Sequence, residues 1–109
     1  MSEKVLVITT VSPDAADSVL NAIALAGGGQ VGNYTHCAFT TSGDGRFKAT
    51  DDATPHVGQA GAINREPEIR IETFCPRNDA KSVVDAIRAA HPYEEPVIYI
   101  VPILSYDEL

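Results

Sequence analysis

The fold begins with the stretch KVLVITTVSPD, residues 4–14. Residues 4–10 form a β-branched apolar run, which is typical of a buried strand. Ser12, Pro13 and Asp14 then predict the start of a helix, with Ser12 as the N-cap, a proline in the first turn and an acid near the positive end of the helix dipole. This stretch therefore predicts a strand that is followed at once by a helix.

Apolar side chains recur at helical spacing from Ala16 to Ile23, so we expect one buried stripe on a helix that ends near Ala26. The glycines at 27–29 end this helix, because glycine tolerates the left-handed conformation of a C-cap. They also match G-x-G-x-x-G, but a dinucleotide site needs a strand before the glycines and a helix after them. Here the order is reversed, which favours a simple turn.

The middle of the chain predicts strands and a loop. Residues 33–41 predict a second strand, and the sequence SGDG at 42–45 predicts a tight turn after it. Residues 46–48 then return as a short strand. Residues 49–65 are mostly small and polar, so we expect an irregular surface loop.

The last part of the chain repeats the strand–helix–strand order. Residues 68–73 alternate strictly between polar and apolar side chains, which predicts a strand with one face in water. Asn78 and Asp79 predict the cap of a second helix. His91 ends that helix, because a residue before proline is driven out of helical conformation. Residues 97–104 predict the last strand.

These elements predict the fold class, which is α+β in one domain that spans residues 1–109. We expect a ferredoxin-like split βαβ sandwich, an antiparallel sheet with two helices on one face and an extra β-hairpin. Residues 5–8 and 97–101 are apolar on both faces of their strands, although two helices cover only one. A monomer rarely leaves such a patch in water, so we predict a homo-oligomer, with three subunits as its expected order.

Composition excludes several classes of protein. The chain has a net charge of -7 with its basic residues scattered singly, which argues against nucleic-acid binding. Its apolar runs fall short of the roughly 20 residues of a membrane helix, so no membrane span is expected. Met1 to Lys4 lead directly into a strand, which favours a cytoplasmic protein. Cys37 and Cys75 form no disulfide framework, so we expect reduced thiols.

Side chains that can bind a ligand or transfer a proton are concentrated at two junctions, GQVGNY at 29–34 and HPYEEP at 91–96. His91 has three interpretations: a helix C-terminal cap, a metal ligand with Glu94 or Glu95, and a general acid–base. Tyr34 and Tyr93 can bury their rings or stack on a small ligand. His36 and Cys37 are neighbours on a predicted strand and point to opposite faces, so Cys37 is expected to face a packed surface.

The spaced motifs resemble those of a known family, the middle domain of the NIF-three-like (NGG-one-interacting-factor-like) proteins, from Val5 to Ile103. The motifs that carry the resemblance are Gly29-x-x-Gly32-Asn33-Tyr34-x-x-Cys37-x-Phe39, Gly43-x-Gly45-x-Phe47, Pro55-x-Val57-Gly58, Glu68-x-Arg70-x-Glu72 and His91-Pro92-Tyr93-Glu94-Glu95-Pro96. These proteins are also described as resembling type I GTP cyclohydrolase homologues. The resemblance implies a stand-alone version of an inserted domain, without the two-metal site of the longer members. The insert is similar in fold to the trimeric CutA and PII signalling proteins, which implies the same fold and a trimer here.

We therefore expect a non-enzymatic, oligomeric domain that binds a small ligand or regulates a partner, with no catalytic residue assigned. Its ligand site is expected where one junction meets the other, and the predicted ligand-binding residues are Gly32, Asn33, Tyr34, Cys37, His91, Tyr93 and Glu94.

Two alternatives stay open. The first is a divalent-metal-binding, CutA-like protein that holds Zn²⁺, Cu²⁺ or Mn²⁺ through His91, Glu94, Glu95 and His36. The second is a hydrolase or cyclohydrolase-like enzyme, or the accessory subunit of one, which only the resemblance suggests. No cofactor is certain in any of these hypotheses.

Overall fold

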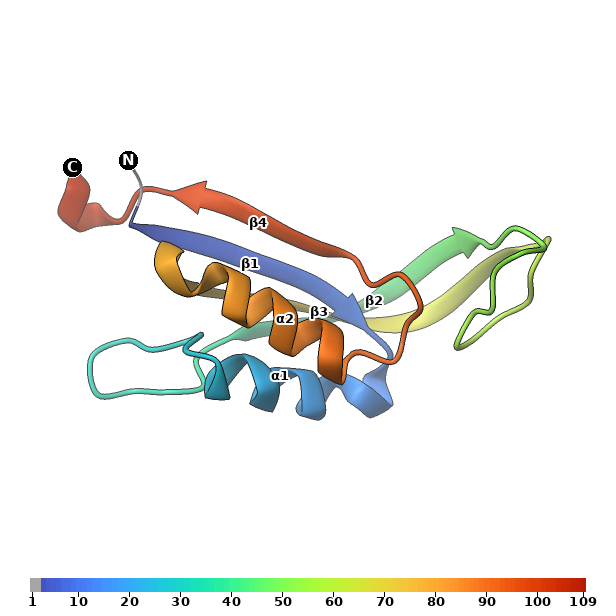
Figure 1. Cartoon of the computed structure of the whole chain (residues 1–109), viewed down its shortest axis with the longest axis horizontal. Helices are drawn as coiled ribbons and strands as arrows, with labels where there is room; N and C mark the ends of the chain where they lie inside the picture. The colour runs from blue at the N-terminus through green and yellow to red at the C-terminus, as the bar shows by residue number, and fades with distance from the viewer. Residues whose placement is uncertain (1–2) are drawn as a thin grey trace.

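The computed structural model describes residues 3–109. Two strand–helix–strand units follow one another along the chain (Figure 1), in the order β1 (Lys4–Val11), α1 (Ala16–Leu25), β2 (Phe39–Lys48), β3 (Ile63–Pro76), α2 (Ala80–Ala90) and β4 (Ile98–Ile103). Short 3-10 turns at Pro13–Ala15 and Arg77–Asp79 lead into the two helices, and a third at Tyr106–Glu108 follows β4.

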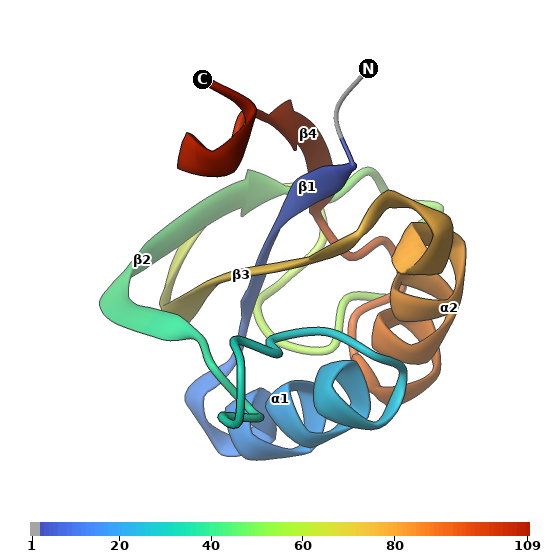
Figure 2. The ribbon, with the colours of Figure 1, turned by 90° about the vertical axis from the view of Figure 1, so that its left-hand side faces the viewer.

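The four strands form one sheet in the order β2-β3-β1-β4, and every neighbouring pair is antiparallel. Strands β1 and β2 are therefore parallel to each other with β3 between them, which is the split βαβ arrangement. Both helices pack against the same face of this sheet (Figure 2). The predicted α+β, ferredoxin-like fold is confirmed.

The core lies between the sheet and the helices. Alternate residues of β1 (Val5, Val7 and Val11) face the helices, and β3 adds Ile71 and Cys75 to the same layer. The helices contribute the apolar stripes that their spacing predicted, namely Ala16, Val19 and Ile23 from α1 and Val83 and Ile87 from α2. These side chains are buried because period 2 in the strands and period 3.6 in the helices turn them toward one layer.

The other face of the sheet carries neither helix. It is apolar across β1 and β4, whereas β3 adds the Arg70–Glu72 ion pair to it. Its central strand β1 presents Leu6 and Ile8, which pair with Val101 and Tyr99 of β4. Tyr99 is 59% exposed and Val101 is 40% exposed. The apolarity of both faces, which the sequence indicated for β1 and β4, is therefore present in the structure.

The position of the hairpin differs from the prediction. β2 continues from Phe39 to Lys48 straight through the glycines of residues 42–45, and its partner β3 starts at Ile63. The turn is therefore the segment at residues 49–62, and the extra hairpin is an extension of β2 and β3 rather than a separate return strand. This extension projects beyond the helices (Figure 1), and the molecule measures 47 × 25 × 22 Å.

Residues 33–38 also differ, because they form a loop rather than the first half of a strand. Gly32 has φ 54° and His36 has φ 61°, both in the left-handed region, which interrupts an extended backbone. The end of α1 was predicted correctly, since Gly27 adopts φ 104° directly after the helix.

The sequence predicted where the two helices start, but the side-chain caps that it predicted there are not formed. Neither Ser12 nor Asp79 makes a side-chain cap hydrogen bond. Each helix begins instead through its 3-10 turn, in which the Ala15 N–H donates to the Ser12 carbonyl at 3.0 Å. Within residues 3–109, no helix is long and apolar enough to cross a membrane.

Candidate ligand groove

The two special junctions lie at opposite ends of the molecule (Figure 1). The loop at residues 29–38 leaves the end of α1, while the corner at residues 91–97 wraps the end of β1 beside the long hairpin. The expectation that Gly32, Asn33 and Tyr34 meet His91 and Tyr93 is therefore wrong within one chain. The predicted topology already implied this separation, because β2 and β4 run antiparallel in a split βαβ sheet and the junctions that precede them therefore lie at opposite ends.

The loop at residues 29–38 is held to the sheet through its backbone. The Cys37 N–H donates to the Gly29 carbonyl at 2.9 Å, and the Thr73 hydroxyl donates to the Cys37 carbonyl at 2.7 Å. The tip is open to solvent, since Tyr34 is 74% exposed. Cys37 itself is only partly buried, so its predicted place in a packed surface is met in part.

His91 connects the end of α2 to the end of β1. It is only 7% exposed. Its Nε2 donates to the Thr10 carbonyl at 2.7 Å, while its Nδ1 accepts the Tyr93 N–H at 3.2 Å. This pattern selects the neutral tautomer with its proton on Nε2. Burial lowers the pKa of His91, although the Thr10 carbonyl opposes this shift.

The His91 contacts decide between its three interpretations in this conformation. Both ring nitrogens already have backbone partners, so neither lone pair is free for a metal or a substrate. His91 is the C-cap residue of α2 through its backbone N–H, which donates to the Ile87 carbonyl at 2.8 Å. Its ring does not cap the helix as an imidazolium would. The neutral ring instead joins the end of β1 to Tyr93 and fixes the corner.

Tyr93 lies in the corner at residues 91–97, against the His91 ring. The two ring centroids are 4.6 Å apart in an edge-to-face arrangement, and the His56 ring lies 6.0 Å from Tyr93 on another side. Burial, and then the neighbouring Glu68 carboxylate, raise the pKa of Tyr93 above its usual range. The phenol therefore keeps its proton and remains a hydrogen-bond donor.

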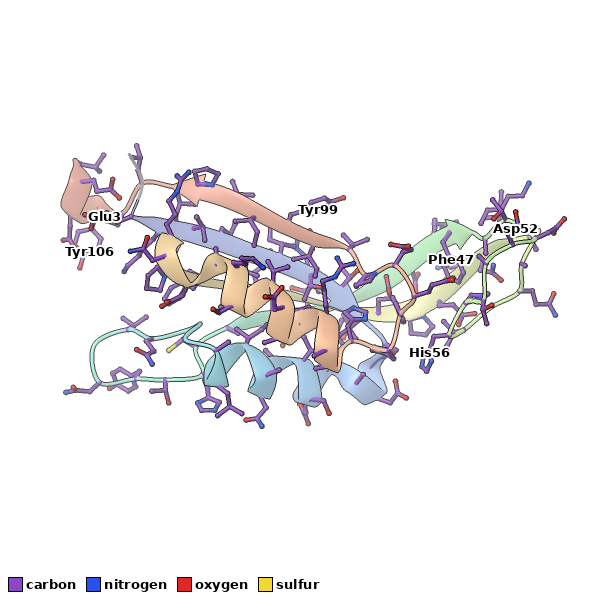
Figure 3. All side chains as sticks on the ribbon, viewed as in Figure 1. Glu3, Phe47, Asp52, His56, Tyr99 and Tyr106 are labelled. Carbon is purple, nitrogen blue, oxygen red and sulfur yellow. The ribbon has the colours of Figure 1, made fainter. Side chains whose placement is uncertain are left out.

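A groove of about 280 Å³ opens between this corner and the base of the hairpin. Its apolar walls are formed by Phe47, Ala49, Ala53, Pro55, Val57 and Val97. Its polar lining is formed by Thr10, Arg46, Lys48, His56, Glu68, Tyr93, Glu94 and Glu95. Figure 3 shows Phe47 and His56 at this end of the molecule, far from Glu3 and Tyr106.

One hydrogen bond holds the hairpin turn against the corner. The Thr54 N–H donates to the Glu94 carboxylate at 3.0 Å, although the two residues are forty positions apart in sequence. This bond joins residues 49–62 to residues 91–97 and so closes one side of the groove. Glu94 is thereby assigned a structural contact that its sequence context did not indicate.

The predicted metal ligands are not brought together. His36 lies beside α1 in a shallow hollow with Asp17 and Asn21, whereas Glu94 and Glu95 line the groove. The residues that the structure describes contain no cluster of three or more His, Cys, Asp or Glu side chains placed to hold a metal ion. Metal binding by this set stays a prediction.

Sequence reasoning missed most of the groove. Arg46, Lys48, His56 and Glu68 received no role, because strands and loops distant in sequence bring them to the corner. One signal was available for Glu68, since its Glu-x-Arg-x-Glu motif was part of the family resemblance. That motif marked the residue without showing what it lies against.

Comparison with known proteins finds relatives much longer than this chain. It is 40% identical over 87 residues to the GTP cyclohydrolase 1 type 2 homolog of Bacillus subtilis, which covers 80% of this chain and 23% of that protein. The protein of the same name from Mycobacterium tuberculosis is 41% identical over 85 residues, which covers 78% of this chain and 22% of the relative. The chain thus spans about a quarter of the length of these relatives. No family model matches it.

Solved structures show the same relationship and a wider likeness in fold. A Bacillus cereus protein related to NIF3 superposes with a TM-score of 0.83 and 34% identity, over 95% of this chain and 26% of that one. CutA1 from a psychrotrophic Shewanella superposes with a TM-score of 0.68 and 19% identity, over 95% and 84% of the two chains. The chain is therefore a homologue of one segment of the GTP cyclohydrolase 1 type 2 homologs, and its fold is that of CutA1.

Proposed function

We propose that this chain is a small-ligand-binding or regulatory domain whose ligand lies in the groove between residues 91–97 and the base of the hairpin. The observation that carries the proposal is the groove itself, which combines apolar walls with the half-buried phenol of Tyr93, the imidazole of His56 and the carboxylate of Glu68. Ligand sites in proteins have this composition, because apolar walls supply affinity and a few polar groups fix orientation. Of the predicted residues, Tyr93 and Glu94 line the proposed groove and His91 packs behind it against Tyr93, while Gly32, Asn33, Tyr34 and Cys37 lie outside it.

The proposed domain works as a homo-oligomer, with a trimer as the expected order. The open face of the sheet supports this assembly, because Tyr99 and Val101 of β4 are exposed there, at 59% and 40%, beside the partly buried Leu6 of β1, whereas Ile8 is already buried. A second copy that covers this face would remove the apolar area from water. The likeness in fold to CutA1 is consistent with this assembly and does not determine its order.

A binding role is proposed in preference to the reaction that the relatives' name suggests. The matched segment is 23% of the Bacillus subtilis protein, so an activity of the whole relative involves much that lies outside the segment. His91, the corner's best candidate for acid–base chemistry, has both ring nitrogens hydrogen-bonded to backbone. Recognition of a small molecule requires neither a free base nor a nucleophile.

A fragment screen by two-dimensional NMR tests the proposal. We expect bound fragments to shift the amide signals of Thr54, His56 and Tyr93 and to leave that of Tyr34, at the other end of the molecule, unchanged. Ala53→Trp, which fills the groove, should abolish these shifts. Ala62→Trp, an exposed change on the same hairpin turn that does not line the groove, should retain them. A screen in which no fragment shifts the groove amides overturns the proposal.

A further inference from the structure

We infer that Glu68 selects the ligand, and that the ligand presents a planar group with two adjacent N–H donors, such as an amidinium, a guanidinium or a 2-aminopyrimidinone edge. This inference rests on the proposed function, since it names the chemistry of the same groove. A carboxylate accepts two parallel N–H bonds from such a group, which fixes both its distance and its plane.

The Glu68 carboxylate is half-buried and makes no ion pair within residues 3–109. The nearest arginine on its own strand is already engaged, because Arg70 Nε lies 2.8 Å from the Glu72 carboxylate. Arg65 on the same strand is engaged with Asp44, also at 2.8 Å. Glu68 is thus left with acceptor capacity that faces the groove, where it lines the cavity with Tyr93 and Thr10.

The neighbouring strand leaves a space for this carboxylate. A Cβ atom at Gly45 would collide with the end of the Glu68 side chain, whereas a Cβ at Gly43 would meet nothing within 4 Å. Neither glycine has a positive φ, so the backbone conformation does not require glycine at either position. Gly45 therefore leaves the space that the end of the Glu68 side chain occupies beside β2, at the groove.

The corner fixes the other side of the carboxylate. His91 is held by the Thr10 carbonyl and accepts the Tyr93 N–H, and its ring packs edge-to-face on the Tyr93 ring with the two centroids 4.6 Å apart. The protonated Tyr93 hydroxyl lies beside Glu68 and satisfies one lone pair at most. Each carboxylate has about four acceptor positions, so enough remain for two further N–H donors.

The rest of the groove fits a flat molecule with an acceptor at its far end. Phe47, Pro55 and Val57 provide apolar walls, and a volume of about 280 Å³ suits one ring with its substituents. Arg46 and Lys48 line the same cavity from β2. A ligand that places its N–H pair on Glu68 can therefore direct a hydrogen-bond acceptor toward these two cations.

Titration calorimetry with four probes tests the inference on the full chain. Benzamidine carries the donor pair with a positive charge, and isocytosine carries it without charge. Benzoate and uracil are their controls, because benzoate lacks N–H donors and uracil lacks the adjacent amino group. The variants are Glu68→Gln and Glu66→Gln, which remove the same charge from the same strand, while Glu66 does not line the groove.

We expect benzamidine or isocytosine to bind. Glu68→Gln should lower the affinity for that probe by ~10- to 100-fold, which is the effect of losing a pair of charge-assisted hydrogen bonds. Glu66→Gln should change the affinity less than about 2-fold. Binding of benzamidine alone identifies a cationic ligand, and binding of isocytosine identifies a neutral heterocycle.

The inference is overturned if both donor probes bind equally to wild type and Glu68→Gln, or if neither binds. Failure of the proposed function is distinguishable from this result. If fragments of other chemistry still shift the groove amides, the groove binds ligands and only the role of Glu68 is wrong. If no fragment shifts them, both proposals fail.

Discussion

At the scale of single residues, the imidazole of His91 holds together the corner at residues 91–97. Its two ring nitrogens are the hydrogen-bond partners of the Thr10 carbonyl, at the end of β1, and of the Tyr93 N–H, just after α2. We expect His91→Ala to lower the free energy of unfolding by about 1–3 kcal/mol, because two buried polar groups lose their partner. Urea unfolding measures this loss. An unchanged midpoint would contradict the assigned contacts.

The same residue predicts how stability depends on pH. Burial lowers the pKa of His91 in the folded state, an effect that His56 adds to and that the Thr10 carbonyl and Glu68 oppose. As the pH falls below the unfolded-state pKa of about 6.5, the unfolded chain takes up a proton before the folded chain does. Stability should therefore fall with decreasing pH until the folded-state pKa is reached. Unfolding curves from pH 8 to pH 5 measure the slope, and His91→Gln should reduce it.

Two glycines of β2 provide a matched pair of substitutions. Gly43→Ala adds a methyl group to open space and should stabilise the strand by about 0.5–1 kcal/mol, because alanine loses less chain entropy than glycine. Gly45→Ala should fold as well, since the flexible Glu68 side chain can move, but it should lose the Glu68-dependent binding. Calorimetry and thermal unfolding on both variants separate the two effects. Equal binding by both variants would show that Gly45 does not position the carboxylate.

Part of the site could be predicted at this scale. The composition of residues 91–96 showed that the corner is special, and His91, Tyr93 and Glu94 do lie in or against the groove. Glu68 and Arg46 could not be found, because their importance depends on tertiary distances. Gly45 was interpreted as a turn residue, since local sequence does not show that a side chain 23 positions later occupies the space above it.

At the scale of elements, sequence periodicity was sufficient for β1, α1, α2 and β4. Each has a strong apolar pattern and a clear end signal, such as the glycines after Ala26 or Pro92 after His91. The hairpin was misplaced because two glycines within four residues are typical of a turn. In the structure, pairing with β3 keeps that stretch extended along its whole length.

The hairpin turn depends on a contact with the corner. The Thr54–Glu94 hydrogen bond is exposed, so Glu94→Ala should cost no more than about 1 kcal/mol of global stability. The turn at residues 49–62 should nevertheless open more often, and we expect faster amide hydrogen exchange at Thr54. Glu95→Ala is the matched control, because Glu95 lines the groove without bonding to the turn. Unchanged exchange at Thr54 would show that this bond does not hold the turn.

At the scale of the whole molecule, the sheet has one face that the helices cover and one that they leave open. If a second copy covers the open face, then Val101→Glu should convert the assembly to monomers, because a carboxylate would be buried there without a partner. Leu25→Glu changes a residue that is 81% exposed at the end of α1 and should leave the assembly intact. Native mass spectrometry measures both. A wild-type monomer would contradict the proposed oligomer.

The pairing of β1 with β4 joins Lys4 to Ile103, so β1 begins and β4 finishes at the same end of the sheet. The corner and the hairpin that frame the groove lie toward the other end of the molecule (Figure 1). A host protein could therefore receive this unit at a surface loop with little disturbance, since its own backbone would be interrupted by only a narrow gap. The unit would then project the groove away from the host. An architecture whose entering and leaving strands are neighbours is thus suited to insertion into other polypeptides.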